Sequence, residues 1–292
     1  MEDLPPVIKK KRLPVEITIR PYMLDHLFDG RAVLPAVEAM QLLADSSRKH
    51  LPEIDLSYIA NADFSKFLYL EQISDQTVTE IFNEIDIDDN GRITARLLTR
   101  NRLKKSAMTR LKEHVTLQIP GRPADLQHLP FSIASVLEKD CFEVPSDQLY
   151  RDLVPFGPAY QNIQDTVILA EDGAIATVSS SSTAVSLESL GSPFPLDAAF
   201  HAACAWGQRF SPIVGFPVGF DQRFIFKPTL SLMNYICRVF PRRRDADPVV
   251  LFFDIWLYDQ DGNPCETILG LQMRDVSGGR LKPPVWIKEG LR

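Results

Sequence analysis

Two separated groups of residues in this sequence have the chemistry of proton transfer. The first is His26-x-x-x-Gly30-x-x-x-x-Pro35. An imidazole titrates near neutral pH and can act as a general base. Gly30 would let a bound molecule approach the backbone closely, and its amide could donate to an oxygen that gains negative charge. Taken alone, His26 could equally be a loop histidine and Gly30 an ordinary turn.

The second group is Asp197-x-x-x-His201, whose spacing places both side chains on one face of a helix. A buried carboxyl at Asp197 could keep its proton and deliver it to a departing oxygen, and His201 could orient either group. Asp197 could instead only interact with the helix dipole. Adding Cys204 gives a metal-like triplet, but no third and fourth zinc ligand follows at short spacing, so we favour a buried polar pair.

Two further motifs lie along the same sequence, one between the two groups and one after them. Phe156-Gly157-Pro158-Ala159-Tyr160 precedes the Asp197 group, and Phe216-Pro217-Val218-Gly219 comes after it. Both combine glycine, proline and aromatic residues, which is typical of turns that shape the wall of a binding site.

Two helices must position these residues. Proline is favoured at the first position of a helix, and apolar residues at three- and four-residue spacing predict a helix over Pro35–Arg48. A second helix is predicted from Pro195 to about Arg209. The alternation of apolar residues at Ile17–Arg20 indicates a strand before the first helix. Strand-like runs also follow each helix: Thr77–Asp88 and Arg92–Arg100 after the first, and Phe224–Phe226, Tyr235–Phe240 and Val249–Tyr258 after the second.

The same order of elements therefore occurs twice, although no residue-level repeat is detectable. The proline-rich stretch around 119–130 has the composition of a linker. We expect an α+β protein with an N-terminal half at 14–120, a linker at 121–132 and a C-terminal half at 133–285.

Two acidic segments are better explained as turns than as calcium loops. With Asp89–Gly91 as a three-residue turn, Glu84 pairs with Arg96 and Glu80 with Arg100. The twelfth position of a calcium loop at this site would be Leu97, where a bidentate glutamate is required. Asp259-Gln-Asp261-Gly262 likewise predicts a turn between two strands.

Composition excludes several classes of protein. The 292 residues carry 32 basic and 38 acidic side chains, a formal net charge of −6, which argues against a diffuse nucleic-acid binder. No apolar run approaches the roughly 18 residues of a membrane span. The basic N-terminus lacks the apolar core of a secretory signal, so we expect a soluble, cytoplasmic protein.

Together the four motifs resemble those of polyketide synthase dehydratase domains, over about residues 14 to 280. That family has His-x-x-x-Gly-x-x-x-x-Pro, then Tyr-Gly-Pro-x-Phe, Asp-x-x-x-Gln/His and a Leu-Pro segment. This chain departs from the pattern at Phe156 in place of tyrosine, Tyr160 in place of phenylalanine, and Phe216 in place of leucine.

The resemblance implies a double-hotdog fold, in which each half is an antiparallel sheet wrapped around a long central helix. It also implies a dehydratase that eliminates water from a 3-hydroxyacyl thioester, with His26 as base, Asp197 as acid and Gly30 at the carbonyl oxygen. No metal or other cofactor is implied. The residues expected to bind substrate are Gly30, Pro35, Phe156, Gly157, Pro158, Tyr160, His201 and Pro217.

In the family, the acyl chain is tethered to an acyl carrier protein by a phosphopantetheine arm. The stretch Ala95–Lys112 holds seven basic residues and no acidic one, which makes it either a docking patch or an ordinary solvated surface. The Arg242–Arg244 triplet is equally open to both interpretations. Two halves in one chain already supply the pair of hotdog units that one site needs. The site therefore does not require a second chain, and a homodimer remains possible.

Two other functions fit the same motifs. One is a product-template-like cyclase, which resembles dehydratases and also pairs histidine with aspartate. The other is a non-catalytic module that binds acyl thioesters. This alternative is suggested by Phe156, which lacks the hydroxyl of the family's tyrosine.

Overall fold

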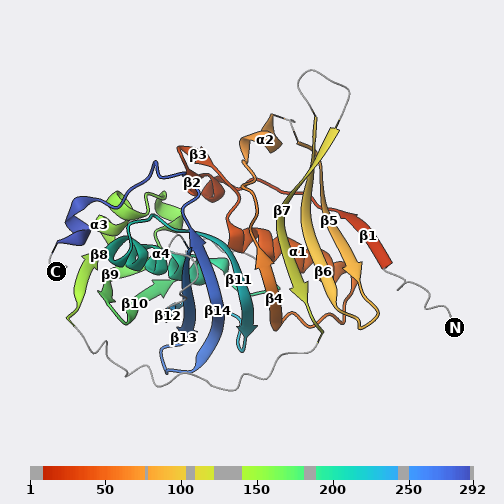
Figure 1. The fold of residues 1–292 in the computed structure, drawn as a ribbon. Coiled ribbons are helices and arrows are strands. Elements are labelled where there is room, and N and C mark those ends of the chain that lie inside the picture. Colours follow the sequence, from red (N-terminus) through yellow and green to blue (C-terminus); the bar gives the residue numbers. More distant parts are fainter. Residues whose placement is uncertain are drawn as a thin grey trace.

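A computed structural model describes residues 9–75, 78–102, 109–121, 140–180, 189–242 and 250–289 of the chain. Within these ranges, twelve strands form one antiparallel sheet in the order β1-β5-β6-β7-β4-β11-β14-β13-β12-β10-β9-β8. The sheet curves around two long helices, α1 and α4 (Figure 1). A separate small hairpin projects beside the sheet, formed by β2 (Leu27–Phe28) and β3 (Arg31–Ala32).

The first half of the molecule surrounds α1 (Ala36–His50), which confirms the helix expected at Pro35–Arg48. Pro35 precedes the helix in extended conformation, and Val37, Met40 and Leu43 turn the apolar face of α1 into the core. The elements of this half are β1 (Lys9–Pro14), β4 (Tyr58–Asp63), α2 (Glu71–Ser74), β5 (Val78–Ile87), β6 (Ile93–Arg102) and β7 (Thr109–Ile119).

The second half surrounds α4 (Pro193–Phe210), which begins two residues before the expected start at Pro195. Nearly the whole helix is buried because the sheet wraps one side of it and α1 packs against another. Its other elements are β8 (Phe142–Pro145), α3 (Ser146–Gln148), β9 (Ile163–Ala170), β10 (Gly173–Ser179), β11 (Phe216–Ile225), β12 (Asn234–Arg242), β13 (Val250–Tyr258) and β14 (Pro264–Arg274).

The two halves join where β4 pairs with β11, so that their sheets are continuous. Gly219 faces Asp63 in this pairing, and a Cβ atom there would lie 2.4 Å from the carbonyl oxygen of Ala62. Only glycine therefore allows the strands to approach so closely at this point. This architecture is the double-hotdog fold that the resemblance to a known family implies.

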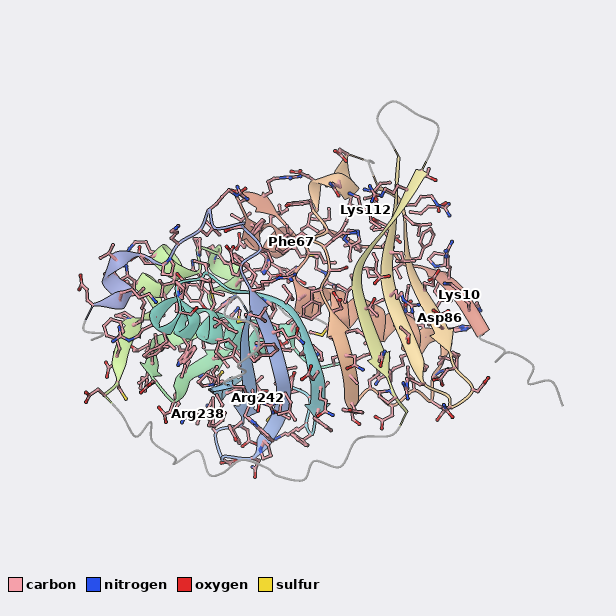
Figure 2. The ribbon with its side chains drawn as sticks, in the orientation of Figure 1. Lys10, Phe67, Asp86, Lys112, Arg238 and Arg242 are labelled. Carbon is pink, nitrogen blue, oxygen red and sulfur yellow. The ribbon has the colours of Figure 1, made fainter. Side chains whose placement is uncertain are left out.

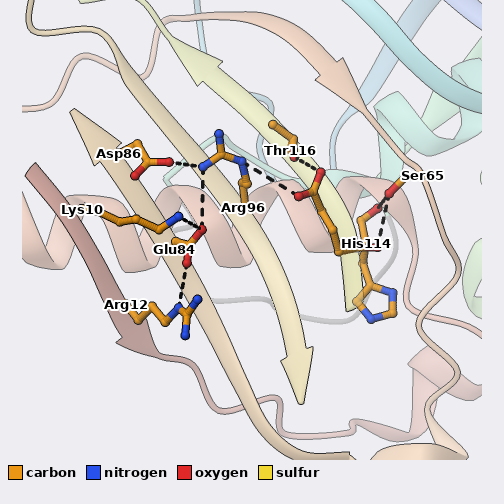
Figure 3. Close-up of polar contacts among 9 residues, drawn as sticks. Lys10, Arg12, Ser65, Glu84, Asp86, Arg96, His114 and Thr116 are labelled. Atoms are coloured by element: carbon orange, nitrogen blue, oxygen red, sulfur yellow. Dashed lines mark hydrogen bonds and ion pairs between the residues drawn. The ribbon is translucent and has the colours of Figure 1, made fainter. Parts of the chain in front are cut away.

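The expected strand at Ile17–Arg20 is wrong, because the first strand lies earlier, at β1. Prolines on both sides, Pro14 and Pro21, end the pairing and start the next helical turn. Figure 3 shows what holds β1 at the sheet edge: Lys10 Nζ and Arg12 Nε each lie 2.7 Å from the Glu84 carboxylate.

Both turn predictions are confirmed. In the β5–β6 hairpin, Glu84 faces Arg96 and Glu80 faces Arg100, as expected. The Asp259 segment forms the turn between β13 and β14, where the Gly262 N–H donates to the Asp259 carbonyl oxygen.

Several expectations fall outside the described residues. The linker predicted at 121–132 lies outside them beyond residue 121. Lys104 and Lys105 of the basic stretch, and Arg243 and Arg244 of the arginine triplet, also lie outside them. In the ranges that are described, no helix is long and apolar enough to cross a membrane.

Candidate active site

One cavity of about 850 Å³ lies between the two halves and receives residues from both. The first half contributes the His26–Gly30 segment, and the second contributes α4 and the start of β11. Phe67 and Lys112 also line the cavity, and both are labelled in the upper part of Figure 2. Six residues expected at the site line this cavity: His26, Gly30, Phe156, Asp197, His201 and Pro217.

His26 follows the short 3-10 helix η1 (Pro21–Asp25) and is packed among aromatic rings. Its ring centroid lies 4.3 Å from that of Phe156 and 5.1 Å from that of Tyr160. Its Nδ1 atom is buried with no hydrogen-bond partner among the described residues.

Burial also lowers the pKa of His26 to about 4, because desolvation disfavours the imidazolium. The Asp197 carboxyl opposes this shift and therefore lies within electrostatic reach of the imidazole. At neutral pH, His26 is consequently a neutral base.

Gly30 forms the tight turn between β2 and β3 together with Asp29. Their φ angles are +72° and +53°, the left-handed pair that a two-residue type I′ hairpin requires and that Asp-Gly supplies. The turn brings Gly30 to the cavity wall, where the space around its Cα is open.

Asp197 and His201 lie one turn apart on α4, and both side chains are buried where they meet the cavity. His201 Nε2 is 3.0 Å from Asp197 Oδ2, but the two atoms are not aligned for a hydrogen bond, and each is otherwise unpartnered among the described residues. The hydroxyl of Tyr150 lies 3.3 Å from the other ring nitrogen, His201 Nδ1.

The Phe156–Tyr160 segment forms the wall behind His26, with only Phe156 at the cavity surface. Tyr160 is fully buried, and its hydroxyl has no partner in the described part of the chain. Gly157 lies against Asp25, whose Cγ would be 2.4 Å from an added Cβ atom. Gly157, Pro158 and Tyr160, like Pro35 at the start of α1, therefore support the wall and are not among the residues that line it.

The fourth motif opens β11 and closes another side of the cavity. Phe216 and Pro217 both line it, and the Phe216 ring meets that of Phe28 edge to face, with centroids 5.2 Å apart. Cys204 also faces the cavity, where its Sγ accepts from Gln208 at 3.4 Å. In the described ranges, no three His, Cys, Asp or Glu side chains are grouped to hold a metal ion.

The sequence motifs did not indicate two further buried side chains near the site, those of Glu38 and Tyr150. Glu38, in the first turn of α1, accepts a hydrogen bond from the Tyr22 hydroxyl at 3.1 Å. Burial raises the pKa of Glu38 to about 7, and the nearby Asp197 carboxyl acts in the same direction. Amphipathic spacing would assign Glu38 to the polar face of the helix, and neither it nor Tyr150 belongs to a recognisable motif.

This geometry can carry out general acid–base chemistry. A neutral imidazole from one half and a carboxyl from the other line one largely apolar cavity. A molecule that has an acidic C–H and a leaving hydroxyl on adjacent carbons could meet both groups at once.

Comparison with known proteins shows what this chain is similar to. A family model of the polyketide synthase dehydratase N-terminal domain matches residues 130–283. No curated protein matches the chain by sequence.

Solved dehydratase structures share the fold. The dehydratase domain of RzxB from Pseudomonas fluorescens is 16% identical, with a TM-score of 0.70 over 90% of this chain and 94% of its own. A trans-AT polyketide synthase dehydratase domain from Brevibacillus brevis is 18% identical, with a TM-score of 0.68 over 92% and 93%. An inactive histidine-to-phenylalanine mutant of the CurJ dehydratase is 15% identical, with a TM-score of 0.65 over 87% and 86%.

Proposed function

The chain belongs to the polyketide synthase dehydratase family, and we propose that it eliminates water from a 3-hydroxyacyl thioester carried on an acyl carrier protein. The observation that carries this proposal is that one and the same cavity is lined by His26 from one half and Asp197 from the other. Neither half holds both groups, so the two hotdog units form one site together.

The reaction needs one base and one acid. His26 Nε2 takes the α-proton of the thioester, and the electrons of that C–H bond form the new double bond as the β-C–O bond breaks. Asp197 gives its proton to the departing hydroxyl, which leaves as water. His26 is then an imidazolium and Asp197 a carboxylate, and return of the proton from His26 to Asp197 resets the site.

Three observations support these roles. The lowered pKa of His26 keeps its ring neutral and able to accept a proton. Gly30 lines the same cavity as His26, and we assign its backbone N–H to the enolate-like oxygen of the thioester. In the CurJ dehydratase, replacement of a histidine by phenylalanine gives an inactive mutant. Because both proton transfers are assigned to side chains, the proposed reaction requires no cofactor.

The charge at the cavity supports a carrier-bound substrate. Lys66, Lys112, Arg274 and Lys282 all line the cavity. The acidic residues beside them are already engaged, since Asp29 pairs with Arg280 and Asp152 with Arg151. We therefore assign the phosphodiester of the carrier's phosphopantetheine arm to these four cations.

Product analysis tests the proposal. Incubation with a 3-hydroxyacyl pantetheine thioester should give the enoyl thioester, lighter by one water, in a mass spectrum. His26→Phe keeps an aromatic ring against Phe156 and should abolish this product, whereas His50→Phe, outside the cavity, should leave it unchanged.

Phe156 motivates one alternative, a module that binds acyl thioesters without turnover. The ring of Phe156 packs on His26 without offering the hydroxyl of the family tyrosine. Binding of the thioester with no enoyl product would support this alternative. Ring products from a poly-β-keto thioester, with no enoyl product, would instead indicate a cyclase. Either outcome would overturn the dehydratase assignment.

A further inference from the structure

We infer that Tyr150 is a positioning residue for the proposed acid: its hydroxyl fixes His201 in the tautomer whose Nε2 carries the hydrogen, and so places an N–H group beside Asp197. This inference rests on the proposed function for its effect on turnover, but the tautomer itself can be measured without any substrate.

The hydrogen-bond partners of the Tyr150 hydroxyl decide the tautomer. The backbone N–H of Ile163 donates to this oxygen at 2.8 Å. Because an amide nitrogen can only donate, the single hydroxyl hydrogen remains free for another acceptor. His201 Nδ1, 3.3 Å away, is the only acceptor recorded for that hydrogen among the described residues.

The opposite arrangement is costly. If His201 Nδ1 carried the hydrogen, the Tyr150 oxygen would accept twice and its own hydrogen would be buried without an acceptor. Tyr150 is only 5% exposed, so its hydroxyl has little access to bulk water. Burial also raises the pKa of Tyr150 far above its ordinary range, which keeps the phenol protonated as a donor.

The local backbone holds the hydroxyl in place. Tyr150 lies in a π-helical turn, η2 (Leu149–Leu153), which the Val154 N–H closes by donating to the Leu149 carbonyl oxygen at 3.0 Å. Turns of this kind are rare and often occur at functional sites. Ile163, at the start of β9, anchors the hydroxyl from the other side.

The consequence is a defined donor beside the acid. With Nδ1 as acceptor, the Nε2–H group of His201 lies beside the acid: Nε2 is 3.0 Å from Asp197 Oδ2, not aligned for a hydrogen bond but close enough for an electrostatic interaction. It can stabilise the carboxylate that forms when Asp197 releases its proton. In the other tautomer, the Nε2 lone pair would face the carboxylate and repel it.

The first test compares two tyrosines. Tyr150→Phe should lower kcat about tenfold and leave KM within about twofold, because the lost contact affects proton transfer from Asp197 and not binding of the thioester. Tyr235→Phe is the matched control: Tyr235 is also 5% exposed and its hydroxyl accepts a backbone N–H, from Leu230 at 2.7 Å, but among the described residues it makes no hydrogen bond to a residue that lines the cavity. Equal losses in both variants would overturn the inference.

The second test removes the tautomer. In a His201→Gln background, a side-chain amide supplies an N–H without any tautomeric choice, so adding Tyr150→Phe should change kcat by less than about twofold. A further loss of about tenfold in that background would mean that Tyr150 only supports the fold, and would overturn the inference.

The third test is spectroscopic and independent of turnover. Nitrogen-15 NMR of the wild-type protein should show His201 with its hydrogen on Nε2, and Tyr150→Phe should introduce the Nδ1–H form. Hydrogen on Nδ1 in the wild type would overturn the inference. If the expected tautomer is found but no thioester is dehydrated, the proposed function fails while the assignment of the tautomer stands.

Discussion

The carboxylate of Asp25 accepts a hydrogen bond from the backbone N–H of Ala159 at 2.9 Å, across 134 positions of the sequence. Its backbone carbonyl also accepts from the Gly157 N–H at 2.8 Å. The residue immediately before His26 thus ties the first half to the wall segment of the second. This link sets the distance between the imidazole and the Phe156 ring that packs on it.

Removing this link should loosen the base. Asp25→Ala is expected to destabilise the protein by about 1–2 kcal/mol and to lower kcat about tenfold, because a part-buried hydrogen bond to a carboxylate is lost. Asp25→Asn keeps an oxygen acceptor and should retain most of the stability and most of the kcat of the wild type. Thermal unfolding and steady-state kinetics measure the two effects, and equal losses in both variants would show that the carboxamide cannot replace the contact.

The pH profile should reflect the burial of His26. The base must be neutral, and its pKa is about 4, compared with 6.5 for an ordinary histidine. We therefore expect kcat/KM to stay level as pH falls from 7 through 6 and to decline only toward about pH 4. The unfolded chain binds this proton at higher pH, so stability also falls below about 6.5, and circular dichroism must confirm folding at each point. An acidic limb near 6.5 would contradict the burial of the imidazole.

Glu38 should make stability depend on pH in the opposite sense. Its pKa is raised from 4.5 to about 7, so the folded state holds a proton that the unfolded state releases. Its stabilising contribution is complete below about pH 4.5 and is lost as pH rises to about 7, a change on the order of 3 kcal/mol. Glu38→Gln should flatten the denaturation free energy over this range, whereas Glu53→Gln, on an exposed residue, should not.

The cations at the cavity should act on the carrier arm and not on the acyl chain. Lys66→Ala combined with Lys112→Ala is expected to raise KM about tenfold for a carrier-bound substrate, with a weaker dependence on salt. The KM for a pantetheine thioester without phosphate should change less than twofold. Lys49→Ala, on an exposed residue outside the cavity, is the control. An equal rise in KM for both substrates would place the lysines at the acyl chain.

Local patterns predicted the elements whose stability is itself local. Apolar residues at helical spacing identified α1 and α4, and a turn with complementary charges identified the β5–β6 hairpin and its register. Periodicity at Ile17–Arg20 failed because flanking prolines, and not side-chain alternation, decide that backbone. Conversely, β1 shows no alternation of apolar residues, since its pairing depends on the distant Glu84.

The site could be predicted only in part for the same reason. The resemblance to a family indicated His26 and Asp197, and the cavity they line was not derivable from spacing. Tyr150 was missed because its role depends on a π-helical turn and on a hydrogen bond from the distant Ile163. Glu38 was missed because a glutamate in a first helical turn normally faces water.

In the proposed reaction, His26 and Asp197 act as one unit across the cavity. The most direct measurement is the turnover of a 3-hydroxyacyl thioester by His26→Phe, Asp197→Asn and the double variant. Each single change should reduce kcat about 1,000-fold, and the double variant should be no slower than the slower single variant, because groups that act in one step are not additive. Wild-type turnover in either single variant, or losses that multiply in the double variant, would contradict the claim.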